Sequence, residues 1–282
     1  MESANLVLND IYRAPAFILL YFFLFLLAKW SKDFSTNYSL NEELTKNDNL
    51  AVAITMAGYY LATAAIFIGS LLGPDNDLVT ELIEAGGYSI LGLAFLNMSR
   101  FINDQIILRR FSNENELEIN QNTAVGAVQF GTYVATGLIA AGAITGTGGI
   151  ETAIVFFILG QASLLLFTLV YDLVTPFSIH NELYEKNTAA GAALGGTMIA
   201  LGIIISNGVS GDFISWQADL TQLLIINIFA FICLPIIRFF MDKLVIPGDD
   251  LSREIVEDRN LGAGILEGTV AICFGLVISL LI

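Results

Sequence analysis

The residues that could carry chemistry in this sequence are polar side chains set inside long apolar segments. Glu267 follows Asn260 by seven residues, and Gln129 follows Asn122 by the same spacing. Seven residues are about 10 Å of helix, so both side chains are expected at membrane depth, where ionisable groups mark functional sites by default. We interpret the two positions as a candidate pore or polar pocket. The alternative for Glu267 is an ion pair near the interface with Arg238 or Arg259.

Further polar residues accompany this pair. Three more amides at membrane depth are candidates for the same pocket: Asn97, Gln161 and Asn227. Arg100 with Asp104, and Arg238 with Asp242, stand four residues apart at two segment ends, a spacing that lets side chains pair on a helix, so both are predicted interfacial pairs. No Ser–His, HExxH or paired-Asp arrangement occurs at membrane depth, so an enzyme is not expected. Neither a cofactor nor a metal site is expected.

The elements that hold these residues are predicted from composition. The chain has 282 residues, of which 55% are hydrophobic and only 14% charged, whereas soluble domains carry about 25% charged residues. Its mean hydropathy is +0.72. Apolar windows of the length that crosses a bilayer predict eight transmembrane helices in an all-α integral membrane protein, at about 11–31, 50–72, 83–103, 123–146, 150–174, 188–209, 220–241 and 261–282.

The basic residues predict the orientation. Of the 12 Lys and Arg residues, all except Arg13 lie in or beside loops 32–49, 104–122, 175–187 and 242–260. The positive-inside rule therefore places these loops in the cytoplasm and both termini on the other side. That other face is acidic, which is interpreted either as a vestibule that attracts cations or simply as the polarity left where Lys and Arg are excluded. A net charge of −15 argues against nucleic acid as a partner.

A fourfold pattern recurs along the chain. Asn49 and Asn187 are 138 residues apart (187 − 49), and so are Asn122 and Asn260 (260 − 122). The same offset matches Arg100 with Arg238. We interpret residues 1–146 and 147–282 as tandem four-span units, each a duplicated helical hairpin. Because each unit has an even number of spans, both enter the membrane in the same direction, as a parallel repeat.

Each repeat begins with an Asn followed by small residues. At the start of a span, Asn is a favoured helix N-cap, and small residues let membrane helices approach closely. The capping residues are Asn49, Asn122, Asn187 and Asn260, and the packing residues are Ala51, Gly58, Gly126, Gly131, Gly191, Gly196 and Gly264. The alternative is that four helix N-termini converge into an anion-facing mouth.

These motifs also carry a resemblance. The segments KNDNLAVAITMAG, NQNTAVGAVQFG and EKNTAAGAALGG resemble the YjfL-like bacterial membrane family, catalogued as domain of unknown function 350, in two tandem copies. The fourth copy, DRNLGAGILEG, departs by placing Gly one residue early and a Glu inside. The resemblance implies a bacterial inner-membrane location and gene neighbourhoods with membrane-associated coat proteins and peptide-ligase-like enzymes. It implies no reaction.

Two functions follow as hypotheses. The first is a channel-like protein or transporter for a small ion or solute between the two repeats. The second is a membrane-embedded scaffold that recruits a cytoplasmic partner through the polar loops. The lipid bilayer is an expected partner in both cases, and the sequence leaves open a homo-oligomer and a cytoplasmic membrane-associated protein.

Overall fold

The regular structure is helical throughout the part of the chain that the computed structural model describes, residues 2–73, 76–106, 112–245 and 250–282. The elements are α1 (Glu2–Phe34), α2 (Leu40–Thr45), α3 (Leu50–Ser70), α4 (Leu78–Ile106), α5 (Asn113–Glu118), α6 (Thr123–Ile144), α7 (Gly149–Val174), α8 (Ile179–Tyr184), α9 (Thr188–Val209), α10 (Trp216–Phe240), a π-helical turn η1 (Met241–Val245), α11 (Leu251–Val256) and α12 (Leu261–Leu281).

Eight of these helices are long and apolar enough to cross a bilayer, counted over the described ranges: α1, α3, α4, α6, α7, α9, α10 and α12. The prediction of an all-α integral membrane protein with eight spans is therefore confirmed. Helices α1, α4 and α10 are longer than their predicted spans. In α4 the extension begins where Asp77 receives hydrogen bonds from Thr80, so a polar side chain starts the helix before the apolar window opens.

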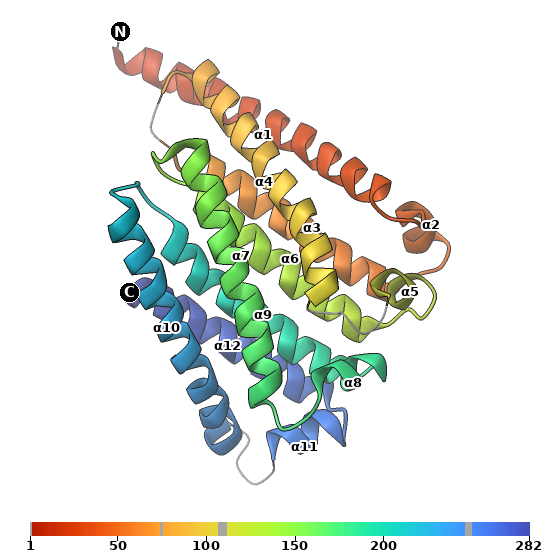
Figure 1. Cartoon of the computed structure of the whole chain (residues 1–282). Helices are drawn as coiled ribbons and strands as arrows, with labels where there is room; N and C mark the ends of the chain where they lie inside the picture. The colour runs from red at the N-terminus through yellow and green to blue at the C-terminus, as the bar shows by residue number, and fades with distance from the viewer. Residues whose placement is uncertain (1, 74–75, 107–111, 246–249) are drawn as a thin grey trace.

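The long helices form two layers. Helices α3, α6, α9 and α12 stand side by side in that order and make a row. The other four cover one side of the row: α4 contacts α3 and α6, α7 contacts α6 and α9, and α10 contacts α9 and α12. Helix α1 contacts α3 and α4. In the view of Figure 1, α4, α7 and α10 lie in front of the row. The row contains all four motif helices.

The close approach within the row depends on its small residues. A Cβ atom built on Gly126 would overlap the backbone of Ala51, and one built on Gly191 would overlap the backbone of Ala124. Gly131 faces Gly195 with the same lack of space. Because membrane helices gain little from the hydrophobic effect between them, this backbone-to-backbone contact supplies the van der Waals packing that holds the row together.

Four short helices lie at one end of the bundle: α2, α5, α8 and α11. They fall in ranges that the sequence predicts as loops. Figure 1 shows both chain ends at the opposite end. The short helices start at Ser39, Ser112, Ser178 and Asp250. A Ser or Asp followed four residues later by Glu, shortly before each motif Asn, was the sequence signal for them.

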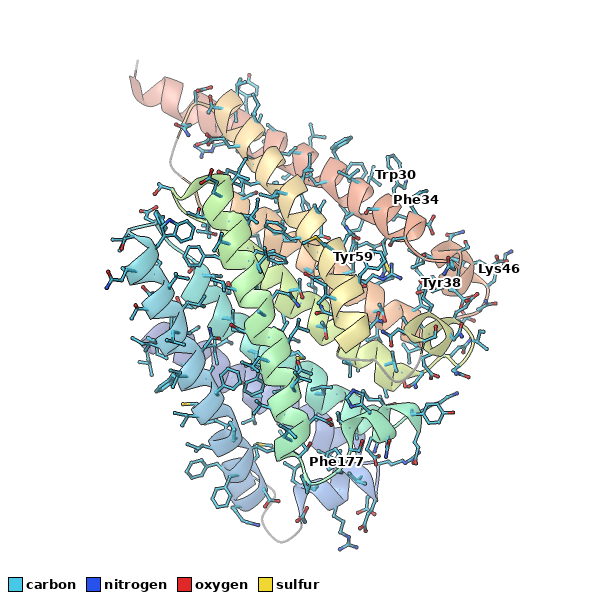
Figure 2. The ribbon with its side chains drawn as sticks, viewed as in Figure 1. Trp30, Phe34, Tyr38, Lys46, Tyr59 and Phe177 are labelled. Carbon is cyan, nitrogen blue, oxygen red and sulfur yellow. The ribbon has the colours of Figure 1, made fainter. Side chains whose placement is uncertain are left out.

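Aromatic side chains mark the outer surface of α1. Trp30 is 61% exposed and Phe34 is 95% exposed, and Figure 2 shows both pointing away from the other helices. Both stand near the end of α1 that lies beside the short helices, where amphipathic rings anchor a span at the headgroup level. Tyr59 on α3, by contrast, is fully buried among the helices.

Candidate functional site

The candidate site is a buried cluster of three side chains, Tyr171, Arg238 and Glu267. The Nη1 atom of Arg238 lies 3.0 Å from Glu267 Oε1 and donates a hydrogen bond of 2.7 Å to the hydroxyl of Tyr171. That hydroxyl in turn donates to Glu267 Oε1 at 3.4 Å. Glu267 is buried, and Arg238 is nearly so. A buried ion pair is stable only when additional hydrogen bonds satisfy its atoms, and Tyr171 provides one to each charged group.

The cluster is incompletely satisfied and adjoins a cavity. Among the described residues, neither Glu267 Oε2 nor Arg238 Nη2 has a hydrogen-bond partner. A cavity of about 30 Å³ is lined by these side chains together with Tyr171, Thr175 and Thr197. A buried void larger than roughly 15 Å³ can hold a water molecule if polar groups face it. The cluster therefore has room and hydrogen-bonding capacity for a very small polar guest.

Three helices of the second unit position this cluster. Tyr171 lies near the end of α7, Arg238 near the end of α10, and Glu267 in the second turn of α12. The guanidinium of Arg238 also stands over the rings of Tyr171 and Phe177, at 5.5 and 5.7 Å from their centroids, and Phe177 lies in the segment joining α7 to α8. The cluster is thus inside the second unit and not at the boundary between the units.

Gln129 occupies the equivalent place on α6 but belongs to a separate environment. It is buried, and α9 stands between α6 and α12 in the row, so the structure does not bring Gln129 and Glu267 into one pocket. One turn further along α6, Tyr133 accepts a hydrogen bond of 2.6 Å from the ammonium of Lys32. Lys32 is buried, and its ammonium also stands over the ring of Tyr59.

A third polar cluster lies where α4, α6 and α7 meet. The amide of Gln161 donates to Asn103 Oδ1 at 2.6 Å and accepts from the hydroxyl of Thr136 at 3.2 Å. All three side chains are buried. Gln161 was a predicted site residue, whereas Asn103 and Thr136 were missed because nothing in their spacing distinguishes them from other polar residues in the spans.

The remaining predicted amides make local contacts. Asn97 accepts a hydrogen bond of 3.3 Å from Tyr59 and donates to the carbonyl of Leu93. Asn227 donates to the carbonyl of Leu223, one turn back on its own helix. The five residues grouped as one pocket from the sequence are therefore distributed over several places.

The arginines of the two predicted Arg–Asp pairs each bind a carboxylate from another segment. Arg100 forms an ion pair with Glu114 at 2.9 Å and donates to Ser35, while the side chain of Asp104 lies outside the described residues. Arg238 forms its ion pair with Glu267, and Asp242 forms one with Lys243 at 2.6 Å. In each unit the Arg thus reaches a carboxylate of the segment that follows or of an adjacent span, and the pairing of Arg100 with Asp104 stays a prediction.

The four motif Asn side chains make hydrogen bonds that recur in every repeat. Each is the N-cap of its helix and accepts a first-turn backbone N–H. The residue before each is in the left-handed region, at φ between 45° and 60°. Each amide nitrogen donates to a carboxylate of the preceding short helix, at 2.7–2.9 Å: Glu43, Glu116, Glu182 and Glu254.

Three of these amides also bond to the short helix of the next repeat. Asn49 donates to the carbonyl of Leu117, Asn122 to that of Leu183 and Asn187 to that of Ile255, each at 2.8 Å. The four N-termini therefore stand along a row and use their amides to connect consecutive short helices. This arrangement differs from an anion-facing mouth, in which the termini would converge on one point.

The acidic end of the bundle has a larger cavity. A space of about 240 Å³ is lined by the turns joining α6 to α7 and α9 to α10, with Asp212 and Asp219 among its residues. Both carboxylates accept backbone N–H bonds, Asp212 from Thr147 and Asp219 from Ile214 and Ser215. Hydrogen bonds from Thr80 similarly hold the pKa of Asp77 below its usual value. These acids organise turns and helix starts.

Comparison with known proteins places these observations in a family. A family model described as Domain of Unknown Function (DUF350) matches the chain twice, over residues 5–144 and 146–282. A curated relative, a UPF0719 transmembrane protein of Aquifex aeolicus (strain VF5), is 22% identical over 232 residues, which cover 80% of this chain and 84% of the relative. No solved structure gives a significant match. The two matches coincide closely with the two units of the repeat.

Proposed function

Because the chain belongs to the family described as Domain of Unknown Function (DUF350), a description that names no activity, we propose its function from the site. The protein binds a small cation or polar solute at the Tyr171–Arg238–Glu267 cluster and conducts it through the second unit. One observation carries this proposal: a buried carboxylate oxygen and a buried guanidinium nitrogen, both unpaired among the described residues, face the same small cavity.

The chemistry of the cluster suits reversible binding of a cation. The unpaired Oε2 of Glu267 can accept a dehydrated cation or a proton, while Oε1 keeps its bond to Tyr171. Added positive charge at Glu267 weakens its attraction to Arg238, because the two cations repel one another at short range. Arg238 then has Asp242, one turn further along the same segment, as an alternative counter-charge. The ion pair would thus exchange partners as the guest enters and leaves.

We further propose the orientation and the membrane. The end that carries the short helices faces the cytoplasm of a bacterial cell, and both termini lie across the inner membrane. The support is the distribution of Lys and Arg, of which, in the described part of the chain, only Arg13 lies toward the opposite end. We also propose that the protein is not an enzyme, since no Ser–His, HExxH or paired-Asp arrangement occurs at membrane depth in the sequence.

Flux measurements test the transport proposal. The full chain in proteoliposomes should carry K⁺, Na⁺ or H⁺, followed with ion-sensitive dyes, and Glu267→Gln should lower the flux at least about ten-fold, the equivalent of about 1.4 kcal/mol of binding free energy. Glu257→Gln is the matched control, because Glu257 is exposed at the end of α11 and should leave the flux unchanged.

Loss of the carboxylate leaves Arg238 buried without its partner, and removing one member of a buried pair costs roughly 3–5 kcal/mol. The double variant Glu267→Gln with Arg238→Gln separates a folding defect from a site defect, since it removes both charges together. It should fold and still fail to conduct. Flux through the wild-type chain no greater than through empty liposomes would contradict the proposal.

The second candidate function is a membrane-embedded scaffold that recruits a cytoplasmic partner, and a different observation favours it. The hydrogen bonds from Asn49, Asn122 and Asn187 link α2, α5, α8 and α11 through the motif helices into one connected platform. A connected surface of this kind would present the side chains of the four short helices to a partner in a fixed arrangement. If the wild-type chain conducts nothing, the platform becomes the favoured site of action.

A further inference from the structure

The row of motif helices is built from one interface used three times. Counting from each motif Asn, residue 4 of the later helix packs on residue 2 of the earlier one: Gly126 on Ala51, Gly191 on Ala124 and Gly264 on Ala189. Residue 15 packs on residue 13 in the same way: Gly137 on Ala62, Gly202 on Ala135 and Gly275 on Ala200. Residue 9 of the earlier helix meets residue 8 of the later one: Gly58 with Phe130, Gly131 with Gly195 and Gly196 with Gly268.

The last helix of the row presents this interface to no described segment. Gly262, Thr269 and Cys273 are residues 2, 9 and 13 of α12, the positions that contact the next helix in the three earlier copies. All three are exposed. They are also small, which is typical of a helix–helix contact in a membrane and not required for a surface that faces lipid. We call these residues the α12 edge.

The first helix of the row has the complementary surface. Ala53, Ala57 and Ala64 are residues 4, 8 and 15 of α3, the positions that receive an earlier helix in α6, α9 and α12. Ala57 is exposed, and Ala53 and Ala64 are half-exposed. These three alanines are the α3 edge, and every one of them is small enough to repeat the backbone approach seen inside the row.

Helix α1 is exposed where its equivalent is buried. Ile18, Leu19 and Phe23 are 59–68% exposed, whereas the residues 138 positions later, Phe156, Phe157 and Gln161 on α7, are at most 6% exposed. Two of those α7 residues pack between α4 and α6: Phe157 stacks on Phe95, and Gln161 bonds to Thr136. Phe156 stacks on Trp216 of α10. In the repeat, α7 is equivalent to α1, and α10 and α12 are equivalent to α4 and α6. The exposed side of α1 is therefore suited to pack against α10 and α12 of another molecule.

Asn260, at the end of the row, lacks one hydrogen bond that the other three motif Asn residues make. Asn260 binds Glu254, as its three equivalents bind their glutamates. The carbonyl that each of the others reaches comes from the short helix of the following repeat, and among the described residues no such carbonyl is available to Asn260, which is exposed. By position, the missing acceptor corresponds to a backbone carbonyl of α2, near Leu44.

We propose that a second copy of this chain completes the row. The α3 edge of the second copy packs against the α12 edge of the first, and α1 of the second copy covers the contact between these two helices. This contact joins two different surfaces, so it is heterologous and repeats from one molecule to the next. It closes into a ring or extends as a filament according to the rotation between copies.

Native Cys273 makes a direct test possible. In the repeated interface residue 13 faces residue 15, as Ala62 faces Gly137, so Cys273 should face residue 64 of a neighbouring copy. The full chain with Cys233→Ala and Ala64→Cys, oxidised in native membranes, is expected to give a ladder of covalent dimers and longer oligomers on a non-reducing gel. Adding Cys273→Ala should abolish the ladder, because residue 64 then has no partner thiol.

Two outcomes would overturn the proposal. Cross-linking with Cys233→Ala alone would join Cys273 to Cys273 and indicate a symmetric α12–α12 contact. An absence of cross-links with a monomeric mass in lipid nanodiscs would indicate that lipid covers both edges. Neither result bears on the flux of Glu267→Gln, so failure of this assembly and failure of the transport proposal are distinguishable. Circular dichroism of the purified variants in detergent serves as a check that they are folded.

Discussion

At the scale of single residues, the motif asparagines show how one side chain can serve three purposes. The carbonyl oxygen caps a membrane helix, and the amide holds a glutamate of its own unit and a carbonyl of the next. Asn122 is buried while doing so, whereas Asn260 does only the first two and is exposed. The difference between these residues is therefore a measure of the inter-unit bond.

We expect Asn122→Ala to destabilise the protein more than Asn260→Ala. Loss of a cap costs about 1 kcal/mol, and Asn122→Ala also removes the hydrogen bonds to Oε2 of the buried Glu116 and to the carbonyl of Leu183, at roughly 1–3 kcal/mol more. Unfolding in mixed micelles, followed by circular dichroism in a detergent that keeps the chain monomeric, measures both. Equal losses for the two variants would show that the inter-unit bond contributes nothing.

At the scale of helices, small residues determine how the row is spaced. The glycines of α6, α9 and α12 lie against backbone atoms of the preceding helix, so the distance between helices is set by main chain and not by side chains. The outer helices follow another pattern, with aromatic contacts such as the stacking of Phe95 on Phe157 at 4.1 Å between ring centroids. The row is consequently the part of the molecule least able to accommodate a larger side chain.

Gly191→Ala should therefore be destabilising by about 1–3 kcal/mol, the usual cost of overpacking, because its Cβ would overlap the backbone of Ala124. Gly87→Ala is the matched control on α4, where a Cβ would have no neighbour within 4 Å. It should be neutral or stabilising, since Ala is the better helix former. The same micellar unfolding experiment compares them, and a neutral Gly191→Ala would show that the row yields at this point.

The helices were more predictable from the sequence than the site. Apolar length gave the eight spans, because a bilayer imposes one length on every helix that crosses it. The partners of Glu267 depend on how three helices are rotated relative to one another, and no local sequence pattern predicts that rotation. Tyr171 could therefore not be inferred, and Arg238 was one of two alternatives. Gln129 was grouped with Glu267 because repeats make positions equivalent, but equivalent positions in a row stay two helices apart.

At the scale of the whole molecule, the two ends of the bundle differ in charge and in construction. One end carries the short helices with most of the Lys and Arg residues, and the other carries acids that organise turns. From this difference in charge, the positive-inside rule predicts a single orientation of the chain in the bilayer.

Labelling of single thiols should reveal that orientation. In a background of Cys233→Ala and Cys273→Ala, Gln217→Cys at the exposed start of α10 should react with a membrane-impermeant maleimide in intact spheroplasts. Asn115→Cys in α5, also exposed, should react only after the membrane is permeabilised. The reverse pattern would invert the proposed topology, and labelling of both sites before permeabilisation would show a leaky preparation, which an impermeant dye detects independently.

The direction of the Asn bonds has a consequence for synthesis. Each of these three bonds runs from an earlier Asn to a carbonyl 61–68 residues later. During synthesis, each Asn amide therefore lacks this bond until the short helix that follows its hairpin has been made. The newest hairpin is consequently the one held by the fewest of these bonds.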